Sequence, residues 1–238
     1  MVIDAGLPCT PDDVAGVLAG TGETVEVVSA THGHSDHVAG VPRLIADHAA
    51  SLYLSEVTIG YLDGSQKPRT PALTQAVRIW RTWLGQPFDL AGLTGFVGGS
   101  AVAGFGGPKG MVGEPLRPAR PLEDGQPLPG APDWEVLATP GHTDCSTCLW
   151  NAKTRTLLTG DTVLSLNGRA WFNPEYVDAD ASARTEAMLR SLPVEHLLPG
   201  HGHPVSGPRI MAEALSHREK PKGWSPLTCR ARPRTPAR

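Results

Sequence analysis

The most informative stretch of this chain lies at positions 31–37 and reads Thr31-His32-Gly33-His34-Ser35-Asp36-His37. Three imidazoles and one carboxylate within six positions are donor groups that zinc accepts in catalytic sites, where one coordination position stays open for water. His32 and His34 project to the same side of an extended chain, while Asp36 and His37 begin the next turn. A solvated histidine-rich turn is the alternative, but four ligand-type residues at this spacing argue against it. The stretch therefore predicts a metal site, and one short loop could serve two adjacent metals.

The residues before this stretch predict a β-strand that leads into it. Glu26-Val27-Val28-Ser29-Ala30 is rich in β-branched side chains, which favour strands. Open α/β sheets bind their ligands at the carboxyl ends of the strands. We therefore expect an α/β fold with the metal site at that edge of a sheet.

Length and composition limit the classes of function. At 238 residues the chain predicts one sizeable domain. A hydrophobic fraction of 40% and a formal net charge of -3 give no nucleic-acid footprint, so nucleic acid is not expected as a partner and a small-molecule substrate is. No secretory signal and no apolar run approaching 18 residues is present, which predicts a soluble cytoplasmic protein without membrane contact.

The cysteines give a weak signal. The chain has four, at Cys9, Cys145, Cys148 and Cys229. Cys145 and Cys148 form a C-x-x-C pair, but no second pair accompanies it and the following residues continue it as a strand. We interpret both as strand residues, with a zinc or redox pair as the alternative.

Periodicity predicts alternating strands and helices along most of the chain. Apolar spacing and end signals place a helix that Thr10 caps, with Val14, Val17 and Leu18 at helical spacing, and further helices over Val38–His48, Thr70–Leu84 and Asp178–Leu192. In the last helix, Ala187, Met188 and Leu192 are the expected buried positions. Strands are expected to end within Met1–Gly6 and to cover Ser51–Leu54, Trp134–Thr139, Thr147–Asn151, Thr156–Thr159 and Val194–Leu198.

Two segments stand apart in composition. Residues 88–120 form a Gly/Pro-rich insertion, in which nine of the twenty-two residues from Gly92 to Gly113 are glycine. We expect it to shape substrate access, with a flexible connection or a weak phosphate-binding loop as alternatives. Residues 219–238 accumulate basic residues and prolines, and this composition predicts a disordered tail.

Three later motifs each place one ligand-type residue directly after glycine at the end of an expected strand. They are Gly141-His142, Gly160-Asp161 and Gly200-His201. Glycine allows a tight turn and a close approach of the backbone to a metal. Singly, the three residues could be a core histidine, a capping aspartate and a turn histidine. Together with the first cluster they are candidate metal ligands.

In these motifs the chain resembles the metallo-β-lactamase superfamily. The segment His32–His37 matches its H-x-H-x-D-H signature, and His142, Asp161 and His201 match its later single ligands in order. The resemblance covers Met1 to about His217 and implies a hydrolase domain over residues 1–218. It implies an αββα sandwich that holds two metals between the ends of its sheets and that here lacks the first N-terminal strands.

The resemblance also implies a role for each residue. His32, His34 and His142 would bind the first metal, and Asp36, His37 and His201 the second. Asp161 would bridge both metals, and Asp4 would orient ligands. Asp36 would also act catalytically, by orienting the nucleophile and receiving a proton. His203 is a rival to His201, and His196 is expected to be structural.

The implied activity is dinuclear, zinc-dependent hydrolysis of an ester, thioester or lactone by a metal-bridging hydroxide. Iron and manganese remain open as alternatives to zinc. The alternative functions are those of a phosphodiesterase or ribonuclease of the same superfamily, or of a non-catalytic metal-binding protein. A bare edge on the first sheet would favour a homodimer.

Departures from the subfamily patterns narrow the substrate. Asp161 stands where true β-lactamases have cysteine or serine, which favours a hydrolase similar to glyoxalase II or to the superfamily's winged-helix hydrolases. Hydrolysis of glutathione thioesters has less support, because Gly202-His203-Pro204 follows His201 where glyoxalase II has a G-H-E-Y-T run. Leu164 stands where homoserine lactonases place tyrosine, and the H-x-E-x-D pattern of the flavodiiron proteins is absent.

Overall fold

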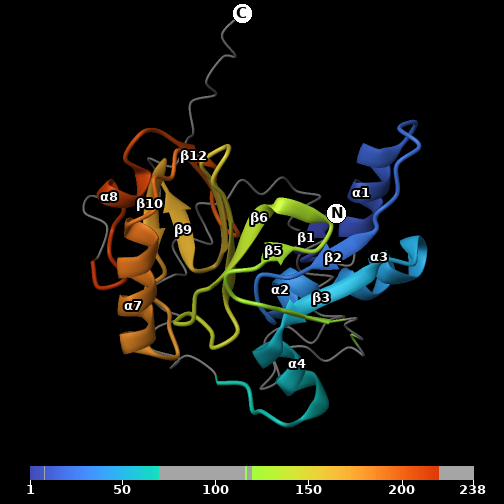
Figure 1. The fold of residues 1–238 in the computed structure, drawn as a ribbon, viewed down its shortest axis with the longest axis horizontal. Coiled ribbons are helices and arrows are strands. Elements are labelled where there is room, and N and C mark those ends of the chain that lie inside the picture. Colours follow the sequence, from blue (N-terminus) through green and yellow to red (C-terminus); the bar gives the residue numbers. More distant parts are fainter. Residues whose placement is uncertain (8, 70–115, 117–119, 220–238) are drawn as a thin grey trace, which may run out of the picture.

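A computed structural model describes residues 1–7, 9–69, 116 and 120–219 of the chain (Figure 1). One sheet is entirely parallel and has the strand order β1, β2, β3, β4. Its strands are β1 (Val2–Ile3), β2 (Val27–Ser29), β3 (Ser51–Ser55) and β4 (Arg120–Leu122).

The second sheet is mixed and has the order β12, β11, β8, β7, β6, β5, in which only β11 and β8 run parallel. Its strands are β5 (Pro127–Leu128), β6 (Ala131–Ala138), β7 (Thr147–Asn151), β8 (Thr156–Gly160), β11 (His196–Pro199) and β12 (Val205–Ser206). A separate antiparallel hairpin joins β9 (Val163–Leu166) to β10 (Arg169–Phe172).

Helices cover the outer faces of both sheets, so that the layers run α, β, β, α (Figure 1). On the side of the first sheet these are α1 (Thr10–Leu18), α3 (Val41–His48) and α4 (Glu56–Asp63), and on the side of the second they are α7 (Ala179–Arg190) and α8 (Ile210–Glu213). A single turn, α2 (Ser35–Val38), lies at the end of β2. The expected α/β sandwich is confirmed. No helix in the described part of the chain is long and apolar enough to cross a membrane.

Three apolar clusters hold these layers together. The alternation along β3 shows the principle, because Leu52 and Leu54 pack with α3 while Tyr53 packs toward the second sheet. Leu189 of α7 closes the cluster on the other outer face. Burying a leucine side chain of this kind is worth about 1.5–3 kcal/mol, so the clusters fix the relative positions of the strand ends.

The described elements correct several expectations. Cys9, not Thr10, is the residue before α1. The Thr10 hydroxyl instead accepts a hydrogen bond from the Leu7 amide. Val17, which the helical spacing placed on the apolar side of α1, is 78% exposed. The helix expected over 38–48 breaks at Gly40 into α2 and α3. A Cβ on Gly40 would lie 2.4 Å from the Leu7 carbonyl oxygen, so the chain packs there too closely for a side chain.

In α7, Leu189 is buried while Ala187 is exposed. Met188, and Leu192 just after the helix, are half-buried against the core. The side of the helix that faces the sheet is therefore displaced from the predicted one. The expected helix at 70–84, the Gly-rich segment 92–113 and residues 220–238 of the tail lie outside the described residues.

Candidate metal centre

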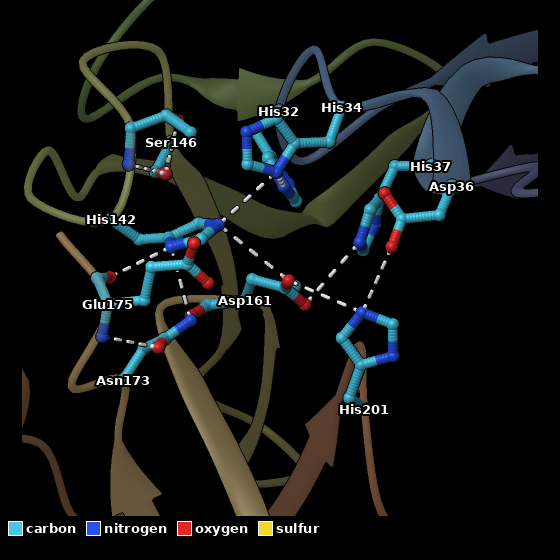
Figure 2. Close-up of polar contacts among 12 residues, drawn as sticks. His32, His34, Asp36, His37, His142, Ser146, Asp161, Asn173, Glu175 and His201 are labelled. Carbon is cyan, nitrogen blue, oxygen red and sulfur yellow. Dashed lines mark hydrogen bonds and ion pairs between the residues drawn. The ribbon is translucent and has the colours of Figure 1, made fainter. Parts of the chain in front are cut away.

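All seven predicted ligand side chains come together where the strands of the two sheets end (Figure 2). From the first sheet, the loop after β2 supplies His32 and His34, and α2 supplies Asp36 and His37. From the second sheet, loops after β6, β8 and β11 supply His142, Asp161 and His201. Residues more than a hundred positions apart thus share one site.

The donor atoms form two groups, and within each group they lie within 4.8 Å of one another. One contains His32, His34, His142 and Asp161, and the other contains Asp36, His37 and His201. Asp161 connects the two groups. Its Oδ2 lies 3.7 Å from His142 Nε2 and 3.3 Å from His201 Nε2, and its Oδ1 lies 3.4 Å from His37 Nε2.

The donor separations fit a tetrahedral cation. Zinc binds nitrogen and oxygen at about 2.0–2.1 Å, so two donors of one tetrahedral ion lie about 3.3 Å apart. His34 Nδ1 lies 3.3 Å from His142 Nε2 and 2.9 Å from His32 Nε2. In the other group, His201 Nε2 lies 3.2 Å from Asp36 Oδ2. The residues present can therefore hold a metal in each group.

Two buried polar atoms support this fit. Among the described residues, His37 Nε2 and Asp161 Oδ1 have no hydrogen-bond partner, although both are buried. A buried polar atom without a partner is costly, on the order of 1–3 kcal/mol. A cation between these two atoms would satisfy both.

Hydrogen bonds behind the imidazoles set their tautomers. His37 Nδ1 donates to Asp4 Oδ2 at 2.8 Å, and His142 Nδ1 donates to the Glu175 carbonyl oxygen at 2.9 Å. Both acceptors can only accept, so Nδ1 of each ring carries a proton and Nε2 faces the site. Each of these two rings is therefore oriented as a metal ligand.

The Asp4 side chain holds the first loop of the site in place through hydrogen bonds. Besides His37, its carboxylate accepts from the Thr31 amide at 2.7 Å and from the Thr31 hydroxyl at 2.9 Å. The Thr31 hydroxyl oxygen in turn lies 3.2 Å from His32 Nδ1. Asp4 has a φ of 60°, a conformation in which aspartate is among the more tolerant residues.

The two groups differ in charge. Burial and the neighbouring imidazoles lower the pKa of His34 to about 4 and that of His32 well below its usual value, so both are neutral. Burial opposes a proton on His201, but the Asp161 and Asp36 carboxylates outweigh it and raise its pKa to about 10. A metal in the second group must therefore displace a proton.

The glycines before the single ligands are sterically required. A Cβ on Gly160, whose φ is 46°, would lie 2.2 Å from Thr31 Oγ1. A Cβ on Gly200 would lie 2.7 Å from Asp161 Oδ1 and 2.9 Å from the His37 ring. The backbone therefore lies close to other residues of the site at these two turns, and its approach to a metal stays a prediction.

Other candidates lie outside the two groups. His203 is exposed, and its carbonyl accepts a hydrogen bond from the Ser165 hydroxyl. His196 is also exposed and lies 3.0 Å from the Ser206 hydroxyl. Cys148 lies in β7 as expected, where burial raises its pKa to about 11, whereas Cys145 lies in the turn before the strand. Both thiols are free.

Sequence reasoning missed two residues that line this region, Asn173 and Glu175. The Asn173 amide donates to the Asp161 carbonyl oxygen at 2.8 Å and its Oδ1 accepts from the Glu175 amide at 2.9 Å. Burial and the Asp161 charge raise the pKa of Glu175, while His142 opposes this. No motif marks either residue, because both follow a hairpin that has no ligand-type signature.

Comparisons with known proteins identify a family that matches most of the chain. The family model described as the metallo-beta-lactamase superfamily matches residues 1–201. A curated relative, the probable metallo-hydrolase YflN of Bacillus subtilis (strain 168), is 24% identical over 243 residues, which cover 90% of this chain and 79% of the relative.

Solved structures share the fold. TTHA1623, in a di-iron-bound form, is 24% identical with a TM-score of 0.55, over 86% of this chain and 82% of its own. TTHA1429 of Thermus thermophilus is 20% identical with a TM-score of 0.55, over 89% and 67%. ST1585 of Sulfolobus tokodaii is 19% identical with a TM-score of 0.53, over 89% and 73%.

Proposed function

Because this chain belongs to the metallo-beta-lactamase superfamily and is a metal-dependent hydrolase, we propose that it hydrolyses an ester, thioester or lactone at a dinuclear zinc centre. The observation that carries the proposal is the Asp161 carboxylate, whose two oxygens face donors of both groups. A carboxylate in that position suits a ligand shared by two cations.

The proposed ligand sets follow the two groups. His32, His34 and His142 would hold one metal, Asp36, His37 and His201 would hold the other, and Asp161 would contact both. The donors are nitrogen and oxygen without thiolate, a set that suits zinc and also iron or manganese. We propose zinc, and the di-iron form of TTHA1623 makes iron the first alternative to test.

When bound, the two cations would lower the pKa of a water molecule and polarise the bond to be cleaved. The side chains of this chain supply the rest. Asp36 Oδ2 lies 3.2 Å from His201 Nε2, which leaves its other oxygen to orient the attacking water, accept its proton and pass that proton to the leaving group. His37 and His142 are held from behind by Asp4 and by the Glu175 carbonyl, which limits their movement during the reaction.

Metal analysis of the purified protein, combined with a substrate panel, tests this proposal. We expect two equivalents of zinc per chain and turnover of a thioester, a lactone or a p-nitrophenyl ester. The His34→Ala variant should lose at least one equivalent and more than about 99% of the activity. The exposed His203→Ala variant is the matched control and should retain both.

Two results would contradict the proposal. Iron in place of zinc after growth in balanced metals would overturn the metal assignment. Faster cleavage of bis-p-nitrophenyl phosphate than of every acyl substrate would overturn the substrate class in favour of phosphodiester hydrolysis.

A further inference from the structure

Glu175 places a carboxylate beside the metal centre that neither metal group uses. Its backbone is held at both ends, since its amide donates to Asn173 Oδ1 at 2.9 Å and its carbonyl accepts from His142 Nδ1 at 2.9 Å. Figure 2 shows its side chain on the side of the site where His142 and Asp161 lie. The backbone from which this side chain extends is therefore held by the same contacts that orient a proposed ligand.

The carboxylate itself has no polar partner. Within residues 1–7, 9–69 and 120–219, no side chain or amide donates to its oxygens, although the residue is half-buried. The Arg69 side chain contacts the loop that follows Glu175 and does not pair with the Glu175 carboxylate. It donates to the Val177 carbonyl at 2.8 Å and forms ion pairs with Asp144 and Asp178. A half-buried negative charge without a partner is costly, and a cationic ligand group would offset that cost.

The location of this charge indicates which ligand would bring the cation. Glu175 interacts electrostatically with His142, Asp161, Asp36 and His201, so it belongs to the same site as both ligand groups. A substrate whose reacting bond lies at the two ligand groups could therefore place a positive group near Glu175. An anionic group at the same place would be repelled.

We propose that Glu175 determines specificity, by selecting substrates that carry a protonated amine close to the acyl group that is cleaved. The inference rests on the proposed ester, thioester or lactone hydrolysis and names the substrate class of that site. Glu175 binds the ammonium group through its carboxylate and takes no part in bond cleavage.

Matched p-nitrophenyl esters test the inference. Esters of glycine, γ-aminobutyrate and ε-aminocaproate carry an ammonium group at three distances from the carbonyl, and esters of propanoate, pentanoate and heptanoate replace that group by methyl. For at least one pair, we expect the wild-type ratio of kcat/KM, amine over methyl, to exceed that of Glu175→Gln by about tenfold. Glu175→Asp keeps the charge and should retain part of the preference.

Glu23→Gln is the matched control, because it removes the same charge from an exposed turn after α1 and should leave every ratio at the wild-type value. Calorimetric binding of the free acids to the zinc-loaded proteins gives a readout besides turnover. The amine-bearing acid should bind the wild-type protein about tenfold more tightly than it binds Glu175→Gln.

The outcomes separate the two proposals. If the wild-type protein cleaves no ester faster than His34→Ala does, the proposed function fails. Calorimetry alone then decides whether Glu175 binds amines. If the ratios and the affinities are the same in wild type and Glu175→Gln for all three lengths, while both proteins hold two zinc ions, the inference is wrong. Loss of zinc from Glu175→Gln, with the amine-over-methyl ratio unchanged in that variant, would assign the residue to positioning His142 instead.

Discussion

At the scale of single residues, Asp4 does more for the site than its distance from the ligand motifs indicates. Its carboxylate accepts three hydrogen bonds, two from Thr31 and one from His37, and so joins the end of β1 to the histidine loop. This contact holds a proton on His37 Nδ1. Metal affinity should therefore depend on Asp4 although it is not a ligand.

Replacing Asp4 by asparagine tests this dependence. The amide would turn one acceptor into a donor and face it toward either Thr31 or His37, and asparagine tolerates the φ of 60°. We expect zinc affinity to fall about 10–100-fold, measured by competition with a chromophoric chelator. Asp12→Asn, which breaks only the exposed pair with Arg43, should bind zinc like the wild type. Equal affinity in both variants would contradict the role of Asp4.

The proton on His201 predicts how the metal-free protein responds to pH. Its folded-state pKa of about 10 lies above the 6.5 of an ordinary histidine. The stabilisation from this proton is therefore complete below about pH 6.5 and is lost as the pH rises through about 10. We expect the free energy of unfolding of the chelator-treated protein to fall over that interval in urea titrations. His201→Gln should flatten the slope, and an unchanged slope in that variant would contradict the assignment.

At the scale of elements, the turns at the strand ends carry the proposed ligands, and their glycines allow the elements to approach. Gly160 ends β8 directly before Asp161 and packs against Thr31 of the other sheet. The Thr147 amide at the start of β7 also donates to the Thr31 carbonyl at 2.8 Å. The two sheets thus meet at Thr31, next to the metal groups.

A Gly160→Ala substitution should separate these elements. Its Cβ would overlap Thr31 and the residue would keep a positive φ, so we expect a loss of about 2–4 kcal/mol in unfolding free energy together with weaker zinc binding. Gly168→Ala is the control, because Gly168 has a φ of 75° and open space around it, so that only backbone strain is added. This variant should lose about 1 kcal/mol of unfolding free energy. Similar losses in the two variants, measured by urea titration, would show that the contact with Thr31 is unimportant.

At the scale of the whole molecule, each proposed metal draws ligands from both halves of the sandwich. His34 and His142 are separated by 108 residues, and Asp36 and His201 likewise come from different sheets. A bound metal would therefore cross-link the two layers and stabilise the folded state over the unfolded one.

Removing the metal should lower global stability. At a free zinc concentration one hundred times the dissociation constant, one site contributes about 2.7 kcal/mol. We expect the chelator-treated protein to unfold at lower urea concentration and zinc to restore the midpoint. In Asp161→Asn the restoration should be small, whereas His203→Ala should recover fully. A midpoint that does not respond to zinc in the wild type would contradict a cross-linking metal.

Local features of the sequence predicted the ligand types and most of the described strands, because apolar alternation and the residues at strand ends act over a few positions. The segment His32–His37 and the three glycine-preceded ligands are such features, as is β7, whose bounds match the prediction. The break between α2 and α3 was not predictable in this way, because it depends on the contact of Gly40 with Leu7.

By itself, the sequence determined that this chain is an α/β hydrolase of a metal-binding family, because the donor residues and their order along the chain are sufficient for that conclusion. Only the tertiary structure decided the distances between the donors around Asp161, and that Glu175 lies beside them with a carboxylate that has no polar partner among the described residues. The reason is physical. These relations join residues more than 100 positions apart, and packing of the two sheets, rather than any local pattern, sets their distances.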